Sequence, residues 1–303
     1  MYVLKCYLCK TYNIKMSKIS IRFFNDREVR AIWDEANSKW WFSVVDIVAA
    51  ITDSPNPRKY WSVLKTRLKN AGNELTTNCS QLKLTAADGK KYATDCFAQE
   101  DITALVKLIP SKKATTFLDW FTYSDNTIDG KSKKKAYTFL ESNLVTDEDV
   151  GTVKSLQQIH AYIFGGLYDF AGQIRTKTIS KGGFTFCLAE YLHPALRDIE
   201  KMPEDTFDQI VDKYVEMNVA HPFMEGNGRS TRIWLDLILK KRLGKCIDWS
   251  KITKNDYLNA MIISHTKSDR IKELLASALT DKINDRETFM KGIDYSYYYE
   301  QED

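Results

Sequence analysis

Long apolar segments are absent from this sequence. No run approaches the roughly 20 apolar residues that a membrane-spanning helix requires. The first residues, MYVLKCYLCKTYNIKMSK, also lack the continuous hydrophobic core of a signal peptide, because lysines interrupt them. We therefore exclude a membrane protein. We expect residues 1–16 to form a disordered leader, with Met16 as an equally acceptable start.

Cysteine is scarce and scattered. The 303 residues include six cysteines, which are Cys6, Cys9, Cys79, Cys96, Cys187 and Cys246. The C-x-x-C pair near the start has no second pair and no neighbouring histidine that would complete a zinc site. Scattered cysteines in a long chain indicate reduced thiols, so we predict a cytoplasmic protein.

A strong charge of either sign is also absent. The 44 Lys and Arg residues nearly balance the 40 Asp and Glu residues, which leaves a formal net charge of +4. So small an excess does not require a nucleic-acid partner, and only a local cluster of charge could indicate one. Internal repeats and low-complexity tracts are missing too. The length of the chain favours two domains over a single core.

The first half of the chain mixes strand and helix patterns. Residues 40–52, WWFSVVDIVAAIT, begin with β-prone aromatics and continue as an apolar stretch compatible with a helix. Pro57 predicts a helix start before RKYWSVLKTRLKN. Residues 75–95 predict a β-hairpin that turns at an Asp-Gly pair, and residues 98–110 have helical spacing that ends at a proline. We therefore predict a smaller α+β domain over residues 17–125.

The second half is predicted to be helical. A polar, lysine-rich stretch follows the first domain, so we place a linker at residues 126–145. Apolar residues then recur at helical spacing in residues 153–172 and 207–220. Residues 174–187 differ, because β-formers around a Gly-Gly pair predict a short hairpin. We predict a mainly α protein, whose second domain, residues 146–303, is all-helical apart from this hairpin.

The stretch HPFMEGNGRSTR, residues 221–232, gathers an unusual set of polar groups. Pro222 disfavours helix at His221, so the preceding helix should end there and leave the imidazole at the mouth of a loop. Gly226 and Gly228 allow the backbone to turn tightly and to approach a ligand. The next helix should begin near Gly228, and its free N–H groups would then form an anion site.

Charged side chains in the same stretch fit that anion site. Arg229 and Arg232 are three residues apart on the predicted helix, so both lie on one face and can bind phosphate oxygens. Glu225 adds a hard oxygen ligand suited to a magnesium ion that arrives with a polyphosphate. Each group alone is more often structural or solvated. Together they predict a site for a magnesium-bound nucleotide with a histidine at its edge.

The stretch matches the Fic family signature HPFx[D/E]GNGRxxR at every defined position. The resemblance extends to GLYDFAGQIR, SKGGF, KYVEMNVAHPF and STRIWLDLILKK, so it covers residues from about 150 to the end. Fic proteins transfer the AMP part of ATP to a hydroxyl of a target protein, usually on tyrosine, serine or threonine. The resemblance therefore implies a protein adenylyltransferase with ATP as co-substrate and Mg²⁺ as cofactor.

The resemblance also implies roles for individual residues. His221 would be the general base that takes the proton from the target hydroxyl, and Glu225 would hold the magnesium ion. The phosphates would be bound by Gly226, Asn227, Gly228, Arg229 and Arg232. Related Doc toxins carry lysine where this chain has Gly228, which favours nucleotidyl transfer over phosphate transfer.

The hairpin before the signature resembles the Fic "flap", which pairs with an extended segment of the target protein. Its residues are Ser180, Lys181, Gly182, Gly183, Phe184, Thr185 and Phe186. Pairing of this kind relies on backbone hydrogen bonds, so it sets the register of a target without requiring one sequence. The alternative is a plain surface hairpin, which gives no reason for its presence in a helical domain.

The C-terminal stretch SYYYE resembles the Fic inhibitory motif [ST]xxxE[GN] in Ser296 and Glu300, at the terminal position typical of class III proteins. Gln301 departs from the motif. The resemblance implies that Glu300 pairs with Arg232 and prevents ATP from seating its γ-phosphate. Neighbouring hydroxyls are candidates for self-modification: Tyr295, Tyr297, Tyr298 and Tyr299. Whether the protein forms a homo-oligomer is left open.

Residues 20–120 resemble the Bro-N domain, through WWFSVVDIVAAITDSPNPRKYWSVLKTRLK and ELTTNCSQLKL. Bro-N domains are associated with DNA binding, and the segment 55–70 contains basic residues and no acid. These candidate DNA contacts are Arg58, Lys59, Lys65, Arg67 and Lys69. A solvated helix face over buried aromatics is an equally good interpretation.

The function we predict is auto-inhibited transfer of AMP to a protein hydroxyl. Two alternatives remain open. The same site could carry out another nucleotidyl or phosphoryl transfer, or remove AMP. The protein could also be a DNA-binding regulator whose Fic half only senses nucleotide.

Overall fold

The computed structural model describes residues 18–86 and 88–301. Our predictions for residues 1–16, including the Cys6–Cys9 pair, lie outside these residues. The N-terminal unit, from β1 to α4, contains both strands and helices, as predicted. Its strands are β1 (Lys18–Phe24), β2 (Arg27–Asp34), β3 (Lys39–Ser43), β4 (Ser80–Thr85) and β5 (Lys91–Ala98). Its helices are α1 (Val44–Thr52), α2 (Pro57–Asn70), α3 (Gln99–Lys107) and α4 (Ala114–Tyr123), with a 3₁₀ turn at Glu74–Thr76.

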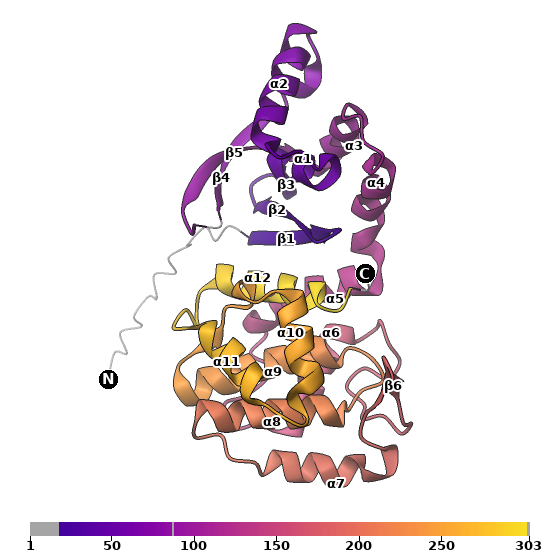
Figure 1. The fold of residues 1–303 in the computed structure, drawn as a ribbon, viewed down its shortest axis with the longest axis vertical. Coiled ribbons are helices and arrows are strands. Elements are labelled where there is room, and N and C mark those ends of the chain that lie inside the picture. The colour runs from indigo at the N-terminus through magenta and orange to yellow at the C-terminus, as the bar shows by residue number, and fades with distance from the viewer. Residues whose placement is uncertain (1–17, 87, 302–303) are drawn as a thin grey trace, which may run out of the picture.

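The five strands form one antiparallel sheet in the order β1-β2-β3-β5-β4. The predicted hairpin of residues 75–95 is present as β4 and β5, although its first residues form the 3₁₀ turn instead of a strand. The helices pack on this sheet around a core that includes Phe42, Phe97 and Phe117. Strand β1 lies at the edge of the sheet that faces the rest of the protein (Figure 1).

Local sequence explains where the first helices begin. Ser43 ends β3 and caps α1, because its side chain accepts a hydrogen bond from Asp46 N. Asn56 caps α2 in the same way, and Pro57 takes the first helical position as predicted. The helix predicted in residues 98–110 is α3, which buries Ile102 against the sheet.

The segment that we predicted as a linker, residues 126–145, contains an ordered helix. Helix α5 (Ile128–Thr138) begins at Thr127, whose side chain caps it, and a 3₁₀ turn follows at Phe139–Glu141. Its Ala136 is fully buried in the second core of the protein. The polar, lysine-rich composition suggested a linker, whereas contacts of α5 with α6 and α12 decide that it is ordered.

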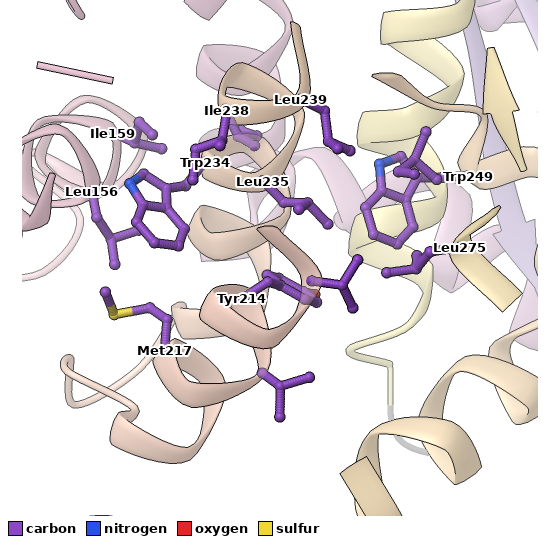
Figure 2. Close-up of a cluster of buried hydrophobic side chains, with 14 of the residues drawn as sticks. Leu156, Ile159, Tyr214, Met217, Trp234, Leu235, Ile238, Leu239, Trp249 and Leu275 are labelled. Atoms are coloured by element: carbon purple, nitrogen blue, oxygen red, sulfur yellow. The ribbon is translucent and has the colours of Figure 1, made fainter. Parts of the chain in front are cut away.

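The rest of the chain is largely helical. Its helices are α6 (Val153–Phe164), α7 (Ala189–Glu200), α8 (Phe207–Ala220), α9 (Asn227–Leu243), α10 (Lys254–Ser264), α11 (Asp269–Ser277) and α12 (Arg286–Tyr298), with a 3₁₀ turn at Trp249–Lys251. Figure 2 shows the core around α9, where Trp234 and Leu235 pack between residues of α6, α8 and α11. Trp234 also donates a hydrogen bond from Nε1 to Thr152 O (3.1 Å), so α9 is fixed to the start of α6.

Two short sheets interrupt the helices. The predicted hairpin is present as β6 (Ser180–Lys181) and β7 (Phe184–Thr185). A second pair, β8 (Cys246–Ile247) with β9 (Leu279–Thr280), was not predicted. The flap is therefore not the single exception to the helical structure that we predicted for residues 146–303. Strands of two residues are too short for an alternating pattern, and only the packing of their flanking helices brings them together.

Helix α12 lies between the two parts of the protein, with β1 on one side and α9 and α10 on the other (Figure 1). Both the 3₁₀ turn that begins at Trp249 and helix α5 also contact it. Among the described residues, no helix combines the length and apolar character needed to cross a membrane. The four described cysteines, Cys79, Cys96, Cys187 and Cys246, are free thiols.

Candidate active site

His221 lies where the sequence placed it, at the end of α8. The helix ends at Ala220, and His221 adopts the left-handed conformation (φ 50°) immediately before Pro222. Its Nδ1 lies 3.1 Å from Asn218 O. A carbonyl oxygen can only accept, so Nδ1 carries the proton and donates it, and Nε2 keeps a free lone pair.

The surroundings of His221 keep the imidazole neutral. Burial lowers the pKa of His221 to about 4, because the charged form would lose its hydration. The ring of Phe186, at the end of the flap, stacks on the imidazole with centroids 3.7 Å apart. At neutral pH the side chain is therefore an uncharged base whose orientation is fixed on two sides.

Arg175 holds the backbone around His221 and was missed by our sequence analysis. Arg175 is 3% exposed, and its guanidinium donates to backbone oxygens of three segments. Nε binds His221 O (2.8 Å), Nη2 binds Ala220 O (3.0 Å), and further bonds reach Lys177 O (2.6 Å) and Cys187 O (2.5 Å). Arg175 therefore joins the end of α8 to both sides of the flap. The cue was in the sequence, since this arginine ends the stretch GLYDFAGQIR.

His160 holds the loop through a hydrogen bond to its backbone, and the sequence analysis did not identify this residue either. Its Nδ1 accepts a hydrogen bond from Gly172 N (2.8 Å), so its Nε2 carries the proton and donates to Glu225 O (2.9 Å). Burial lowers the pKa of His160 to about 4, which keeps this tautomer neutral. The ring stacks on Phe223 with centroids 3.8 Å apart. A buried histidine on a helix gives no sign of this task in the sequence.

The loop requires glycine at position 226 for steric reasons, and at position 228 a side chain would collide with Glu300. Gly226 has φ 81°, and a Cβ there would lie 2.4 Å from the ring of Phe164. A Cβ on Gly228 would lie 2.2 Å from Glu300 Oε1. The backbone at the start of α9 is thus approached closely by an aromatic ring on one side and by a carboxylate on the other.

The side chain of Asn227 forms hydrogen bonds within the loop. Its Oδ1 accepts from Phe223 N and its Nδ2 donates to Phe223 O, both at 2.8 Å. The side chain is 2% exposed, so it holds the loop closed across the start of α9. Its contact with a nucleotide phosphate, which the resemblance implies, stays a prediction.

Arg229 is buried and faces two carboxylates. Nη2 lies 2.7 Å from Glu225 Oε1, and Nη1 contacts Asp129 of α5. Its Nε is buried and has no hydrogen-bond partner among the described residues. An unsatisfied buried cationic donor at the start of a helix fits a site that receives an anion. Asp129 was not predicted as part of the site, because it lies in the segment that we interpreted as a linker.

Arg232 is held by helix α12. Its Nε donates to Ser296 Oγ (2.8 Å), and its Nη2 donates to Ser296 O (2.7 Å) and to Glu300 Oε1 (2.6 Å). Burial alone would lower the pKa of Arg232, but Tyr257 and Glu300 outweigh it and raise the pKa above its usual value. The guanidinium is therefore charged and fully engaged, and the contact that the resemblance implied between Arg232 and Glu300 is present.

Glu300 is ionised in this contact. Burial would raise the pKa of its carboxyl group, but the Arg232 guanidinium has the larger combined effect and lowers it. The carboxylate lies against Gly228, at the amino end of α9, so it adds negative charge where the loop would receive an anion.

The flap is exposed beside His221. Gly182 (φ 58°) and Gly183 (φ 80°) form its turn, because two consecutive positive φ values suit a two-residue hairpin turn. Ser180 through Thr185 are exposed, and Phe186 is half-buried against His221. Lys181 and Phe184 face each other across the hairpin. The predicted flap residues are therefore together and accessible.

Glu225 is the candidate magnesium ligand, and its carboxylate is 52% exposed at the edge of the loop. No group of three or more His, Cys, Asp or Glu side chains is arranged around a metal site in the part of the chain that the structure describes. A magnesium ion usually takes one or two protein carboxylates together with water and substrate phosphates, so a single accessible carboxylate fits. In this structure Glu225 is paired with Arg229 instead.

The predicted DNA contacts lie on α2, at the end of the N-terminal unit away from α12 (Figure 1). Arg58, Lys59, Arg67 and Lys69 are exposed. Lys65 differs, because its Nζ lies 2.7 Å from Asp95 of β5. The segment has no acid in sequence, but the neighbouring strand supplies one.

Comparison with known families agrees with this geometry. Residues 151–239 match the family described as the Fic/DOC family. These residues are therefore similar to a Fic domain. The matched residues run from the start of α6 through α9, so they include the flap, His221 and the phosphate loop. Helix α12 and the N-terminal unit lie outside the match.

Two relatives are named as adenylyltransferases. Protein adenylyltransferase VbhT of Bartonella schoenbuchensis is 29% identical over 153 residues, which are 46% of this chain and 31% of that protein. Probable protein adenylyltransferase y4lH of Sinorhizobium fredii is 33% identical over 118 residues, which are 35% of this chain and 61% of that protein. The chain thus spans less than two thirds of the length of either relative.

Solved structures give weaker likenesses. The BepC protein of Bartonella tribocorum, solved with bound AMPPNP, has a TM-score of 0.44 and 19% identity, and the match covers 50% of this chain and 84% of that chain. Fic-1 of C. elegans, residues 134–508, has a TM-score of 0.38 and 15% identity, with 77% of this chain and 72% of that chain covered.

Proposed function

We propose that this protein is an auto-inhibited adenylyltransferase that transfers AMP from ATP to a hydroxyl side chain of a target protein. One observation carries the proposal. A neutral histidine with a free Nε2 lies beside a helix amino terminus that has two buried arginines, and the second arginine is occupied by Glu300. The names of the two relatives support the same activity.

The proposed reaction is an in-line displacement at the α-phosphorus of ATP. The target hydroxyl oxygen bonds to phosphorus as the bond to the pyrophosphate oxygen breaks, and pyrophosphate leaves. The hydroxyl proton moves to Nε2 of His221, whose Nδ1 keeps its own proton and continues to donate it to Asn218 O. A base with a pKa of about 4 is deprotonated at neutral pH, so it is ready to accept this proton.

The phosphate groups would lie at the amino end of α9. Backbone N–H groups of Gly226 to Gly228 and the positive end of the helix dipole favour an anion there. Arg229 and Arg232 would supply charge to the β- and γ-phosphates once their present carboxylate partners are displaced. Glu225 would hold a magnesium ion, which neutralises phosphate charge when it is bound.

Helix α12 would act as an inhibitory helix of the class III type. The carboxylate of Glu300 holds the position on Arg232 that a γ-phosphate would need, and its charge repels the nucleotide. The target would dock on the flap as an added β-strand, which brings its hydroxyl to His221 beside Phe186. We expect self-modification of the tyrosines in α12 when this helix dissociates from Arg232.

Mass spectrometry tests the activity. A lysate is incubated with magnesium and with ATP, UTP or GTP in separate reactions, using the Glu300→Gly variant, and modified peptides are identified by their mass. An added AMP group that depends on His221 supports the proposal. A phosphate or UMP adduct would support the alternative transfers, and loss of existing AMP would indicate removal.

A second function is favoured by the four exposed basic residues of α2. We propose that the N-terminal unit is a Bro-N-like domain and that Arg58, Lys59, Arg67 and Lys69 bind DNA phosphates. This function would be separate in space from the inhibitory helix, because α2 lies at the opposite end of the N-terminal unit (Figure 1).

A further inference from the structure

Helix α12 is bound on two faces. On the face toward the Fic domain, Ser296 holds Arg232, and Tyr299 OH donates to Trp249 O (3.0 Å) and Ile252 O (2.9 Å). The opposite face carries Asp294, Tyr295 and Tyr298, and all three contact the N-terminal unit. The same 13-residue helix therefore joins the phosphate site to a separate part of the protein.

Strand β1 is buried more completely than an edge strand normally is. Every residue from Ile19 to Phe24 is at most 8% exposed, although side chains of a strand alternate between two faces. Phe24 packs in the core of the N-terminal unit, whereas Phe23 packs on α12. The second face of β1 is thus covered by the inhibitory helix, which also protects the sheet edge.

Asp294 is the buried polar link in this interface. Its side chain is fully buried, and its Oδ2 accepts from Ile21 N (2.5 Å). Its Oδ1 lies 2.7 Å from Lys133 Nζ of α5 and also receives Tyr137 OH. A buried carboxylate needs all of these partners, so α12 can leave β1 only if Asp294 is rehydrated or finds another partner.

Two tyrosines complete the contact. The ring of Tyr298 stacks on Phe23 with centroids 4.0 Å apart and planes 10° apart. Its hydroxyl donates to Asp26 Oδ1 (2.7 Å), and the hydroxyl of Tyr295 donates to Glu28. Both acceptors lie at the β1–β2 turn and at the start of β2. Tyr295 is next to Ser296 in the sequence, and Tyr298 is two residues after it. The contact with the N-terminal unit therefore lies on the opposite side of the same helical turn that binds Arg232.

A short helix has little stability of its own. An isolated helix of about 13 residues is marginal in water, so α12 depends on tertiary contacts to keep its shape. The Arg232 contact engages only the last turn of α12 and the two residues after it, Ser296 to Glu300. The position of Glu300 against Gly228 therefore depends on whatever holds the remaining face of α12.

We propose that β1 and the β1–β2 turn form a docking surface for α12, and that this docking determines how firmly Glu300 occupies the phosphate site. The partner that fits this surface is an amphipathic helix with a buried carboxylate and two tyrosines, and α12 is that helix. A molecule that takes the place of Tyr298 on Phe23 must displace α12 and would release the inhibition. The inference rests on the proposed function, because it needs α12 to be inhibitory.

The experiment measures self-labelling and lysate labelling by the full-length protein with labelled ATP and magnesium. Phe23→Ala removes the stacked ring, and a second variant, Asp26→Asn with Glu28→Gln, changes exposed acceptors and keeps the core intact. Leu75→Ala is the matched control, because it removes a buried side chain from the core of the same unit and no contact with α12. Glu300→Gly gives the labelling of the protein without the inhibitory carboxylate.

We expect Phe23→Ala to raise labelling by about tenfold and the acceptor variant by about threefold, since stacking and hydrogen bonds of this kind are individually modest. Leu75→Ala should stay at the wild-type level. Phe23→Ala should raise labelling further when it is combined with Glu300→Gly, because Ser296 still binds Arg232 in that variant. Hydrogen exchange in residues 286–300 should accelerate in the first two variants only.

Each other outcome counts against the docking surface. If Glu300→Gly is active and neither docking variant exceeds wild type, the surface does not control inhibition and the proposed function survives. If Leu75→Ala activates as strongly as Phe23→Ala, general destabilisation explains the effect. If Phe23→Ala does not fold, the acceptor variant decides. If Glu300→Gly itself is inactive while ATP binds, the proposed function is wrong.

Discussion

Replacing Glu300 by glycine should activate the enzyme, and the structure sets the size of the effect. The Arg232 side chain is 3% exposed and that of Glu300 is 22% exposed, so water screens their attraction only weakly. A hydrogen bond to a charged group contributes about 1.5–3 kcal/mol, which corresponds to about 10- to 150-fold in the fraction of molecules with a free Arg232.

The lower end of this range is expected. Ser296 still binds Arg232 through two hydrogen bonds, from Nε (2.8 Å) and Nη2 (2.7 Å), after the carboxylate is removed. Arg232 is therefore not free in the variant, although the negative charge beside Gly228 is gone. We predict that labelling increases about tenfold over wild type, from the same charge-assisted contribution.

The assay compares wild type and Glu300→Gly with labelled ATP, magnesium and a cell lysate. Gln301→Gly is the matched control, because it places the same flexible residue one position later, where the side chain is exposed and does not contact Arg232. Labelling by Glu300→Gly combined with His221→Ala should fall by about 10²–10⁴-fold from that of Glu300→Gly alone. Equal labelling of wild type and Glu300→Gly, with ATP bound by both, would refute the reasoning about the inhibitory helix.

The remaining predictions concern the base, the metal, the N-terminal unit and pH. In the Glu300→Gly background, His221→Ala should lower the rate by about 10²–10⁴-fold while ATP binding, measured by calorimetry, is kept; an equal loss of affinity would make His221 a binding residue. Glu225→Ala should abolish activity at every magnesium concentration, and full magnesium-dependent activity would place the ligand elsewhere. Full-length protein should bind duplex DNA with strong salt dependence. Replacing the four exposed basic residues of α2 with glutamine should weaken the retention of DNA. Unchanged retention of DNA by that variant would exclude α2 as the DNA-binding surface. Burial lowers the pKa of His160 to about 4 from 6.5, so the contribution of His160 to stability is complete above pH 6.5 and declines as pH falls toward 4. The difference in unfolding midpoint between wild type and His160→Asn should therefore shrink over that range. A constant difference would contradict the buried neutral tautomer.

The candidate site could be predicted from the sequence because its parts are local. Pro222 ends α8, the two glycines shape the loop, and Arg229 and Arg232 are one turn of helix apart, so backbone rules fix their arrangement within about twelve residues. The flap is similar, since a Gly-Gly pair between β-formers specifies a hairpin without help from the rest of the chain. Helix starts at Ser43 and Pro57 followed the same local rules.

The supporting residues could not be predicted in this way. Arg175 acts through carbonyl groups at positions 177, 187, 220 and 221, and every residue has a carbonyl group, so the pattern of side chains does not identify them. Asp129 contacts Arg229 across 100 residues, from a helix whose polar composition resembles a linker. Such contacts depend on how helices pack, and packing depends on the shape of many side chains at once.

The C-terminal residues 294–300 show most clearly which features the sequence determines and which features only the tertiary structure determines. The sequence by itself determined that Ser296 and Glu300 lie one helical turn apart, which allows both to reach a single guanidinium. Only the tertiary structure decided that Asp294, Tyr295 and Tyr298, on the other side of the same helix, lie against Ile21, Asp26 and Glu28, more than 260 residues earlier. Spacing along a helix is a property of the backbone, whereas the partner of its second face is selected by burial of a strand edge that is far away in the sequence.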